Sequence, residues 1–320
     1  MYKLKQIPED FIVEEIPLRK PDEGQYVIVE LKKTNYNTED AVQTTAKALH
    51  VNRKQISYAG NKDKHAVTTQ YITIYKVREE RINNLELKDI KLRVIGRTSS
   101  PISLGDLKGN KFTITIRNLD ESEKVEKKTR IPNYYDSQRF STHNGEIGKY
   151  IVKKQFKEAC KLITKIDNKH GPKITEWLHK NNNDYVNALK QLPVKVLQIY
   201  AHSYQSLLWN KTVEKYLEKE REQTKIPIIG FGTETEGEIE SIISEIMEKE
   251  NVKERDFIIR EFPKLSLEGS HRNLYANIEN LKISNKETDE LNPNKYKVTV
   301  QFELGKGSYA TMVVKYLVKN

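Results

Sequence analysis

The sequence predicts an α+β fold in which one domain is interrupted by a second. Strand-like patterns dominate up to about residue 144, helical periodicity dominates from there to about residue 270, and a strand pattern returns near the C-terminus. The length of 320 residues fits about two domains at ~150 residues each. We therefore expect residues 1–144 and 271–320 to form one discontinuous domain with a mixed or antiparallel sheet. Residues 145–270 are expected to form a mainly helical α+β inserted domain.

The first third of the chain combines several strands with one helix. Asn37 or Thr38 can cap a helix that runs to about Leu49, and Glu39 and Asp40 stand where the helix dipole favours negative charge. Apolar alternation and β-branched residues predict strands at 25–31, 56–59, 68–74, 91–98 and 111–117.

From residue 146 the apolar spacing becomes helical. It predicts helices at 146–165, 174–180, 185–191 and 195–221, with Pro193 breaking the run between the last two. Near the C-terminus, alternation predicts a strand at 298–302, followed by a turn at 305–307 and a last helix that Ser308 can cap.

Composition excludes several classes of protein. Hydrophobic residues make up 37% of the chain, enough for a folded core, which argues against a disordered chain. No apolar run reaches the ~18 residues of a membrane span, and the N-terminal segment lacks the apolar region of a secretory signal. Cys160 is the only cysteine, so an intramolecular disulfide framework and a multi-cysteine metal site are excluded. We expect a soluble, cytoplasmic protein.

The charge distribution suggests a polyanionic partner. The formal net charge is +10, and residues 51–200 hold 30 basic against 16 acidic side chains, whereas residues 201–250 hold 6 against 11. Such asymmetry is typical of a cationic face that meets nucleic acid. A general bias towards lysine, which accounts for 42 of the 55 basic residues, is the alternative explanation.

The motifs of several enzyme classes are missing from the sequence. It contains no G-x-x-x-x-G-K-[ST], no G-x-G-x-x-G after a strand, no H-E-x-x-H and no G-x-S-x-G. The seven histidines are scattered, with no close pair suited to a metal ion. Any chemistry must therefore use ordinary side chains.

Asp63 is the first candidate for such chemistry. The segment 58–70 places it in a turn between two predicted strands, flanked by Lys62 and Lys64. Nearby cations favour an ionised carboxylate, which can act as a nucleophile or a base. Glycine, asparagine and aspartate are also ordinary turn formers, so a plain hairpin turn is the alternative.

A second candidate segment, 131–140, contains Asn133, Tyr134, Tyr135 and Arg139. Aromatic faces stack on extruded bases, amides read base edges, and arginine binds phosphate. An aromatic-rich edge of the core would have the same composition.

Two further segments lie near the ends of the chain. The first, 8–15, is preceded by Lys5 and reads by itself as an acidic turn entering a strand. In the second, 302–312, a glycine-flanked lysine precedes a helix and could hold an anion. The same residues would also form a simple strand–turn–helix joint, with Tyr309 in the core.

Together these segments resemble one protein family. In the same order and at similar separations, PEDFIVEE, YAGNKDKHAVTTQ, NYYDSQRF and FELGKGSYATM are similar to segments of the TruD family of tRNA pseudouridine synthases. The stretch QSLLWN at 205–210 resembles a helical stretch of that family, and the resemblance covers essentially the whole chain.

The resemblance implies an isomerase that converts uridine to pseudouridine in RNA, most typically at position 13 of tRNA. It implies tRNA as the partner, no cofactor, metal or nucleotide, and no membrane. The oligomeric state stays open, with a monomer as the expectation. Asp63 would be the catalytic carboxylate, and whether it attacks the sugar or the base also stays open.

The resemblance also implies roles for other residues. Phe11, Asn133 and Tyr309 would contact the substrate base, with Tyr135 as a second aromatic wall. Lys5 would pair with Asp63 or with a phosphate. The side chains of Lys62 and Arg139 would contact the RNA backbone.

Two alternatives remain at this point. One is a non-catalytic RNA-binding protein or RNA chaperone on the same scaffold, which would share the basic face but would lose nothing on substitution of Asp63. The other is a lysine-rich α+β protein with a small-molecule role, which would show no affinity for tRNA even at low salt.

Overall fold

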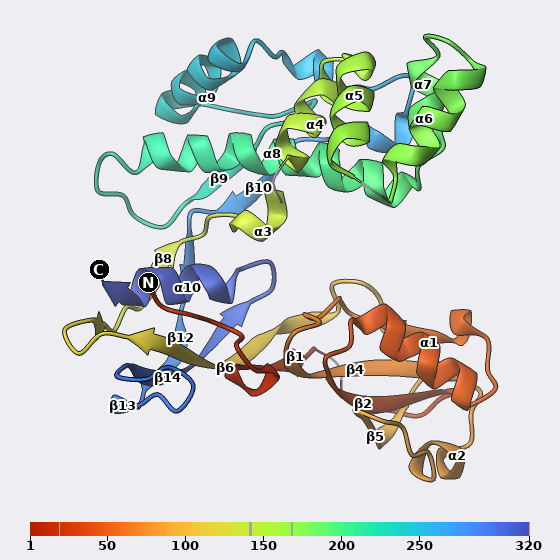
Figure 1. Cartoon of the computed structure of the whole chain (residues 1–320), viewed down its shortest axis with the longest axis vertical. Helices are drawn as coiled ribbons and strands as arrows, with labels where there is room; N and C mark the ends of the chain where they lie inside the picture. Colours follow the sequence, from red (N-terminus) through yellow and green to blue (C-terminus); the bar gives the residue numbers. More distant parts are fainter. Residues whose placement is uncertain (19, 141–142, 168, 320) are drawn as a thin grey trace. The chain divides into compact units, whose positions relative to one another are not determined.

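The computed structural model describes residues 1–18, 20–140, 143–167 and 169–319 (Figure 1). The chain divides into two compact units, here called unit 1 (Met1–Ile131 with Ala276–Asn320) and unit 2 (Pro132–Tyr275). The chain leaves unit 1 directly after Ile131. Three candidate site residues therefore belong to unit 2, although the sequence suggested the first domain for them: Asn133, Tyr135 and Arg139.

Unit 1 contains most of the strands. Its elements are η1 Pro8–Asp10, β1 Phe11–Pro17, β2 Tyr26–Thr34, α1 Thr38–Ala48, η2 Arg53–Gln55, β3 Ile56–Tyr58, β4 Val67–Tyr75, α2 Glu79–Asn83, β5 Ile90–Thr98, β6 Leu107–Leu119, β7 Lys124–Val125, β12 Glu279–Ile283, β13 Glu287–Thr288, β14 Tyr296–Gly305, α10 Ala310–Leu317 and β15 Val318–Lys319. The paired strands β8 Arg130–Pro132 and β11 Tyr275–Asn277 carry the chain between the units.

The main sheet of unit 1 has the strand order β12-β14-β6-β1-β4-β2-β5, with β13 on β14 and β3 on β4. Its pairs are antiparallel except β1 with β4, which are parallel. This mixed sheet with helices confirms the predicted α+β class. The first strand of the sequence, β1, therefore lies in the interior of the sheet between β6 and β4.

Helix α1 forms where local signals predicted it. The side chain of Asn37 accepts a hydrogen bond from the backbone N–H of Asp40 over 2.8 Å, which caps the helix. The helix buries Ala41, Val42 and Ala46 in one core with alternate residues of β2 and β4. In the other half of the sheet the rings of Phe11, Phe112 and Phe302 pack in sequence, with centroids 6.2 and 5.5 Å apart.

A buried guanidinium ties distant parts of unit 1 together. Arg117 in β6 donates to Asp10 over 2.7 Å, to Asp289 over 2.8 Å and to Glu290 over 3.0 Å. Burial alone would lower the pKa of Arg117, but these hydrogen bonds raise it above its usual value. The cluster fixes η1, and so the segment that leads into β1.

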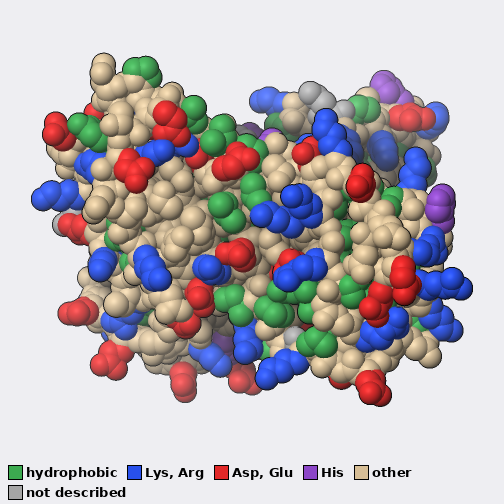
Figure 2. Space-filling view, turned by 90° about the horizontal axis from the view of Figure 1, so that it is seen from below, with side chains coloured by type: hydrophobic (Ala, Val, Ile, Leu, Met, Phe, Trp, Pro, Cys, Tyr) green, Lys and Arg blue, Asp and Glu red, His purple; other side chains and the backbone are tan. Residues whose placement is uncertain are grey.

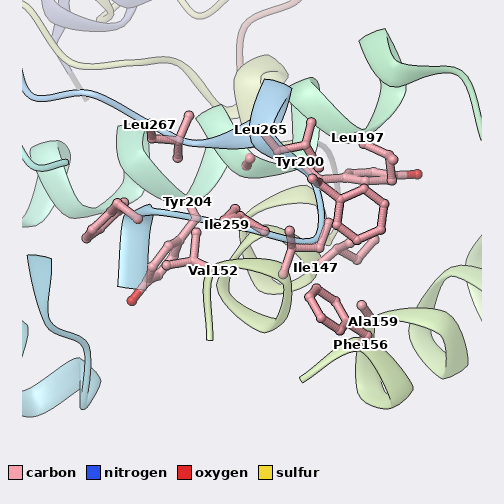
Figure 3. Close-up of a cluster of buried hydrophobic side chains, with 14 of the residues drawn as sticks. Ile147, Val152, Phe156, Ala159, Leu197, Tyr200, Tyr204, Ile259, Leu265 and Leu267 are labelled. Atoms are coloured by element: carbon pink, nitrogen blue, oxygen red, sulfur yellow. The ribbon is translucent and has the colours of Figure 1, made fainter. Parts of the chain in front are cut away.

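Unit 2 is mainly helical. Its elements are α3 Ser137–Phe140, α4 Asn144–Val152, α5 Phe156–Ile166, α6 Gly171–Lys180, α7 Tyr185–Lys190, α8 Val194–Tyr216, β9 Lys225–Ile228, α9 Gly237–Glu250, η3 Glu254–Phe257, η4 Pro263–Leu265 and β10 Ser270–Asn273. Figure 3 shows its core, in which Ile147 and Phe156 pack among Leu197, Tyr200 and Tyr204 of α8. At Gly148, helix α4 crosses α8 so closely that a Cβ would lie 2.0 Å from the carbonyl oxygen of Tyr200.

Two local predictions about helices were wrong. The helix expected at 146–165 is two helices, α4 and α5, because Lys154 adopts a left-handed backbone with φ 57° and the chain turns before Phe156. Ser308 does not cap the last helix: Tyr309 occupies the cap position, and no side-chain hydrogen bond is made there. None of the helices formed by the described residues has the length and hydrophobicity that a bilayer-spanning segment requires.

Candidate active site

Asp63 lies on a loop that begins and ends at a split edge of β4. Strand β2 occupies one edge of β4 along its whole length. The other edge is shared, because β1 pairs with Val67–Thr69 and β3 pairs with Ile72–Ile74. Residues 59–66, which join β3 to β4, therefore leave β3 beside this gap and enter β4 at Val67, where β1 begins to pair.

Buried polar groups hold the loop in place. The backbone N–H of Lys62 donates to the hydroxyl of Thr38 over 2.8 Å, and that hydroxyl donates to the side-chain oxygen of Gln70 over 2.8 Å. The Gln70 amide in turn donates to the carbonyl of Gly60 over 3.0 Å. Thr38 and Gln70 are 1% and 0% exposed, so this chain of hydrogen bonds is shielded from water.

The side chain of Lys62 points into the protein. Its Nζ lies 2.5 Å from a carboxylate oxygen of Glu15 in β1, and the two side chains are 6% and 1% exposed. The sequence suggested a contact between Lys62 and the RNA backbone. The structure does not favour it, because a buried ammonium paired with Glu15 cannot reach a phosphate without breaking this ion pair.

Lys33 supports the backbone of Asp63 through a hydrogen bond. This residue of β2 is completely buried, and its Nζ donates to the carbonyl of Asp63 over 3.0 Å and to that of Tyr36 over 2.5 Å. Burial lowers the pKa of Lys33 to about 8, with the charge of Asp63 opposing and that of Lys62 reinforcing the shift.

The carboxylate of Asp63 points outward and meets Lys5. Its side chain is 43% exposed, and Oδ2 lies 3.0 Å from Nζ of Lys5. The same ammonium lies 4.0 Å from the centroid of the Phe11 ring, within cation–π range. The structure thus brings Lys5, Phe11 and Asp63 together, as their motif positions implied. Phe11 itself is only 2% exposed, with Lys5 over its ring.

The backbone of Lys5 is in an unfavourable conformation. Its φ is +57°, in the left-handed region that costs a non-glycine residue about 1 kcal/mol or more. Strain of this kind persists where the surroundings hold it, and here it directs the ammonium towards Asp63.

The other predicted residue of unit 1 is Tyr309. It is half-buried and precedes α10, and its carbonyl accepts hydrogen bonds from the N–H groups of Met312 and Val313. In the loop, Lys64 and His65 beside Asp63 are exposed.

Asn133 in unit 2 is held through both its backbone and its side-chain amide. Its N–H donates to the carbonyl of Leu274 over 2.8 Å, and its side-chain Nδ2 donates to the carbonyl of Asn273 over 3.1 Å. Arg272 donates to the Asn133 carbonyl and, over 2.7 Å, to Oδ1. Since Oδ1 already accepts from Arg272, the second N–H of the amide is the group that Asn133 could offer to another molecule.

Tyr135 lies beside Asn133 in a cationic aromatic cluster. The guanidinium of Arg272 lies 4.2 Å from the centroid of its ring and that of Arg139 lies 5.9 Å away, while Trp209 packs edge-on at 5.6 Å. Asn210 of α8 fixes the Tyr135 backbone through two hydrogen bonds of 2.9 Å, to its N–H and its carbonyl.

Arg139 is anchored to the same helix. Its Nε donates to the Ser206 hydroxyl over 3.3 Å, and its carbonyl accepts from the Ser203 hydroxyl over 2.8 Å. This explains the stretch QSLLWN, whose Ser206, Trp209 and Asn210 all support the segment 133–139.

The sequence did not identify three of the supporting residues. Asn210 lies in a stretch that resembles the family, but nothing in the sequence linked Asn210 or Arg272 to Asn133 and Tyr135. Lys33 carried no signal, since it lies just beyond the strand predicted at 25–31, where a lysine reads as an ordinary surface residue. Among the described residues, no group of three or more His, Cys, Asp or Glu side chains could hold a metal ion.

Comparison with known proteins identifies the family. A family model described as tRNA pseudouridine synthase D (TruD) matches residues 2–177, 173–226 and 211–317. Probable tRNA pseudouridine synthase D 2 of Methanocaldococcus jannaschii is 34% identical, across 98% of this chain and 90% of its own length. Probable tRNA pseudouridine synthase D of Methanosarcina barkeri is 32% identical, across 99% of this chain and 93% of its own.

A solved structure agrees. The crystal structure of the putative tRNA pseudouridine synthase D (TruD) from Methanosarcina mazei has a TM-score of 0.76 and 27% identity, covering 98% of this chain and 93% of that one. These matches place the chain among the pseudouridine synthases, a class of RNA-modifying isomerases. The chain belongs to the TruD family, which confirms the resemblance seen in the sequence.

Proposed function

We propose that this protein converts uridine to pseudouridine at position 13 of tRNA, with Asp63 as the catalytic carboxylate. The observation that supports this most directly is the carboxylate itself, which points outward from a loop that the buried side chains of Thr38 and Gln70 anchor. Family membership supplies the reaction, and the loop supplies a fixed acidic group that can perform it.

The reaction is an isomerisation and needs no co-substrate. The bond from N1 of uracil to C1′ breaks, a bond from C5 to C1′ forms, a proton leaves C5, and N1 gains one. Asp63 would act as the nucleophile and form a covalent bond to either the sugar or the base while the two are separated. Lys5 would balance the charge of Asp63 before and after the attack.

Access to the glycosidic bond requires the uridine to leave its stack, at a cost of a few kcal/mol. Stacking on an aromatic side chain returns roughly 1–3 kcal/mol per base. We propose that Phe11, Tyr309 and Tyr135 provide such surfaces, that Asn133 donates its remaining N–H to the base, and that Arg139 contacts the RNA backbone. For Phe11 this requires the Lys5 ammonium to move off the ring. We further propose that the protein acts as a monomer in the cytoplasm.

The test uses unmodified tRNA transcripts and a chemical adduct that maps pseudouridine. Wild-type protein should produce one new adduct, at position 13. Asp63→Asn should produce none and should bind the transcripts within about threefold of wild type, because the amide keeps the shape of the carboxylate. Glu86→Gln, which removes an exposed carboxylate before β5, is the matched control and should remain active.

Each outcome is decisive. Activity of Asp63→Asn equal to wild type would exclude a catalytic Asp63 and favour a non-catalytic role for the loop. Folded wild-type protein that modifies no transcript would refute the proposed reaction.

A further inference from the structure

Helix α5 of unit 2 has one buried face and one strongly basic face. Phe156, Ala159, Cys160 and Ile163 are buried in the core of the unit. On the other side, Lys157, Lys161 and Lys165 are exposed. These three, here called the lysine row, are spaced i, i+4 and i+8, so their side chains lie on one face, with Cβ atoms about 6 Å apart from one to the next.

The lysine row is not neutralised by acidic side chains. None of its three lysines forms an ion pair with any residue that the structure describes. Glu158 is the only acidic residue of α5, and it is half-buried. Asp167, just after the helix, accepts hydrogen bonds from the N–H groups of Lys169 and His170, so its carboxylate is already engaged.

Helix α8 and the turn after it carry three lysines with the same spacing, but these lysines form ion pairs with acidic side chains. Lys211, Lys215 and Lys219 pair with Glu250, Glu245 and Glu238, respectively. On the face shown in Figure 2, basic and acidic side chains are likewise interspersed. Residues 143–191, which include α5, contain ten lysines against five acidic residues, so part of the positive excess of the sequence lies in this segment.

We propose that the lysine row binds the phosphate backbone of the RNA substrate. This inference rests on the proposed function and names a surface of unit 2 that holds the tRNA. Three unpaired ammonium groups in a line release counterions when they meet a polyanion, which gives affinity without reading sequence. The row should therefore contribute to binding and leave the choice of uridine and the chemical step unchanged.

The test compares two triple variants that remove the same charge at the same spacing. Lys157→Gln, Lys161→Gln and Lys165→Gln together remove the lysine row. Lys211→Gln, Lys215→Gln and Lys219→Gln together form the control. Glutamine keeps helix propensity, so both proteins should fold. Binding of an unmodified tRNA transcript is measured at several salt concentrations, together with kcat and KM for pseudouridine formation.

We expect the first variant to bind about tenfold more weakly at ~0.1 M salt, with the slope of log K against log salt reduced by about 2. Its KM should rise by a similar factor while kcat at saturation is unchanged. The control should stay within twofold of wild type on every measure.

Equal binding by both variants would overturn the proposal and leave the proposed reaction standing. Conversely, salt-dependent binding that requires the lysine row in a protein that modifies no transcript would support the row and refute the reaction. Vesicles that contain phosphatidylserine serve as a second polyanion: a loss of vesicle binding without a loss of RNA binding would also overturn the proposal.

Discussion

Lys33 donates a hydrogen bond from a completely buried position to the backbone carbonyl of Asp63, 3.0 Å away. The candidate catalytic residue is therefore supported by a charge that burial disfavours. This charge also links the loop to pH, because the pKa of Lys33 is lowered to about 8 in the folded protein from an ordinary value of 10.5.

The first prediction concerns stability in alkaline solution. Between about pH 8 and 10.5 the unfolded chain holds a proton on Lys33 that the folded chain has lost, so the free energy of unfolding should rise with pH in this window. Other groups titrate there too, so the measurement is the difference between wild type and Lys33→Met in guanidinium unfolding. That difference should grow in favour of wild type by on the order of 2 kcal/mol. A difference that does not change with pH would contradict this account.

A second prediction concerns Lys5. Lys5→Gly relieves the left-handed strain but removes the ion pair with Asp63 and the contact with Phe11. The free energy of unfolding should stay within about 1 kcal/mol of wild type, since the relief and the losses are of similar size. The rate of pseudouridine formation should fall at least tenfold.

Lys76→Gly is the matched control for this experiment, because Lys76 is exposed and also left-handed, with φ 49°. It should leave the rate unchanged. A Lys5→Gly protein as active as Lys76→Gly would show that the ammonium has no part in the reaction.

The third prediction concerns Arg117. Arg117→Met leaves Asp10 and Asp289 buried without their cation, which should destabilise the protein by about 3–5 kcal/mol. Thermal and denaturant unfolding measure this loss. Lys111→Met, which removes an exposed cation from the same strand, should cost less than about 1 kcal/mol.

The same cluster should be sensitive to acid. Burial would raise the pKa of Asp289, but hydrogen bonds from Asn118, Asn292, Leu291 and Arg117 hold it at about 2. Its contribution to stability is therefore complete above the ordinary value of 3.8 and is lost as the pH falls towards 2. Asp289→Asn should lose less stability than wild type between pH 5 and pH 2, and parallel losses would contradict the assignment.

The fourth prediction concerns Arg272 as a positioning residue. Arg272→Gln releases Oδ1 and the carbonyl of Asn133, so the amide can turn and its free N–H is no longer directed. KM for tRNA should rise at least fivefold, and the double variant with Asn133→Ala should be no worse than Asn133→Ala alone. Arg221→Gln, which removes another arginine stacked on a tyrosine of unit 2, is the control and should change neither constant. Additive effects would indicate that Arg272 acts independently of Asn133.

Local signals were sufficient for much of the fold. Asn37 caps α1 because a cap depends on the next three residues alone, and the turn around Asp63 follows from its glycine, asparagine and flanking strands. The break at Lys154 was missed because an apolar spacing continues across it, and only the packed structure shows that the backbone turns there.

Long-range pairs were beyond the sequence. Arg117 meets partners 107 and 172 residues away, and Lys62 meets Glu15 47 residues away. The sequence does not show which lysines become buried. Only the structure distinguishes the buried Lys33 and Lys62 from the exposed Lys64. The family motif suggested Asp63 as a partner of Lys5, a pair that the structure shows, because such a motif reflects which residues are neighbours after folding.

The interior position of β1 has a consequence for biosynthesis. β1 is synthesised before its neighbours β4 and β6, and the sheet also needs β14, which follows Tyr275. Unit 2 is one continuous stretch of the chain. It can finish folding while the C-terminal part of unit 1 is still untranslated. A nascent chain that is halted on the ribosome before β14 should therefore have a folded unit 2 and an incomplete sheet in unit 1.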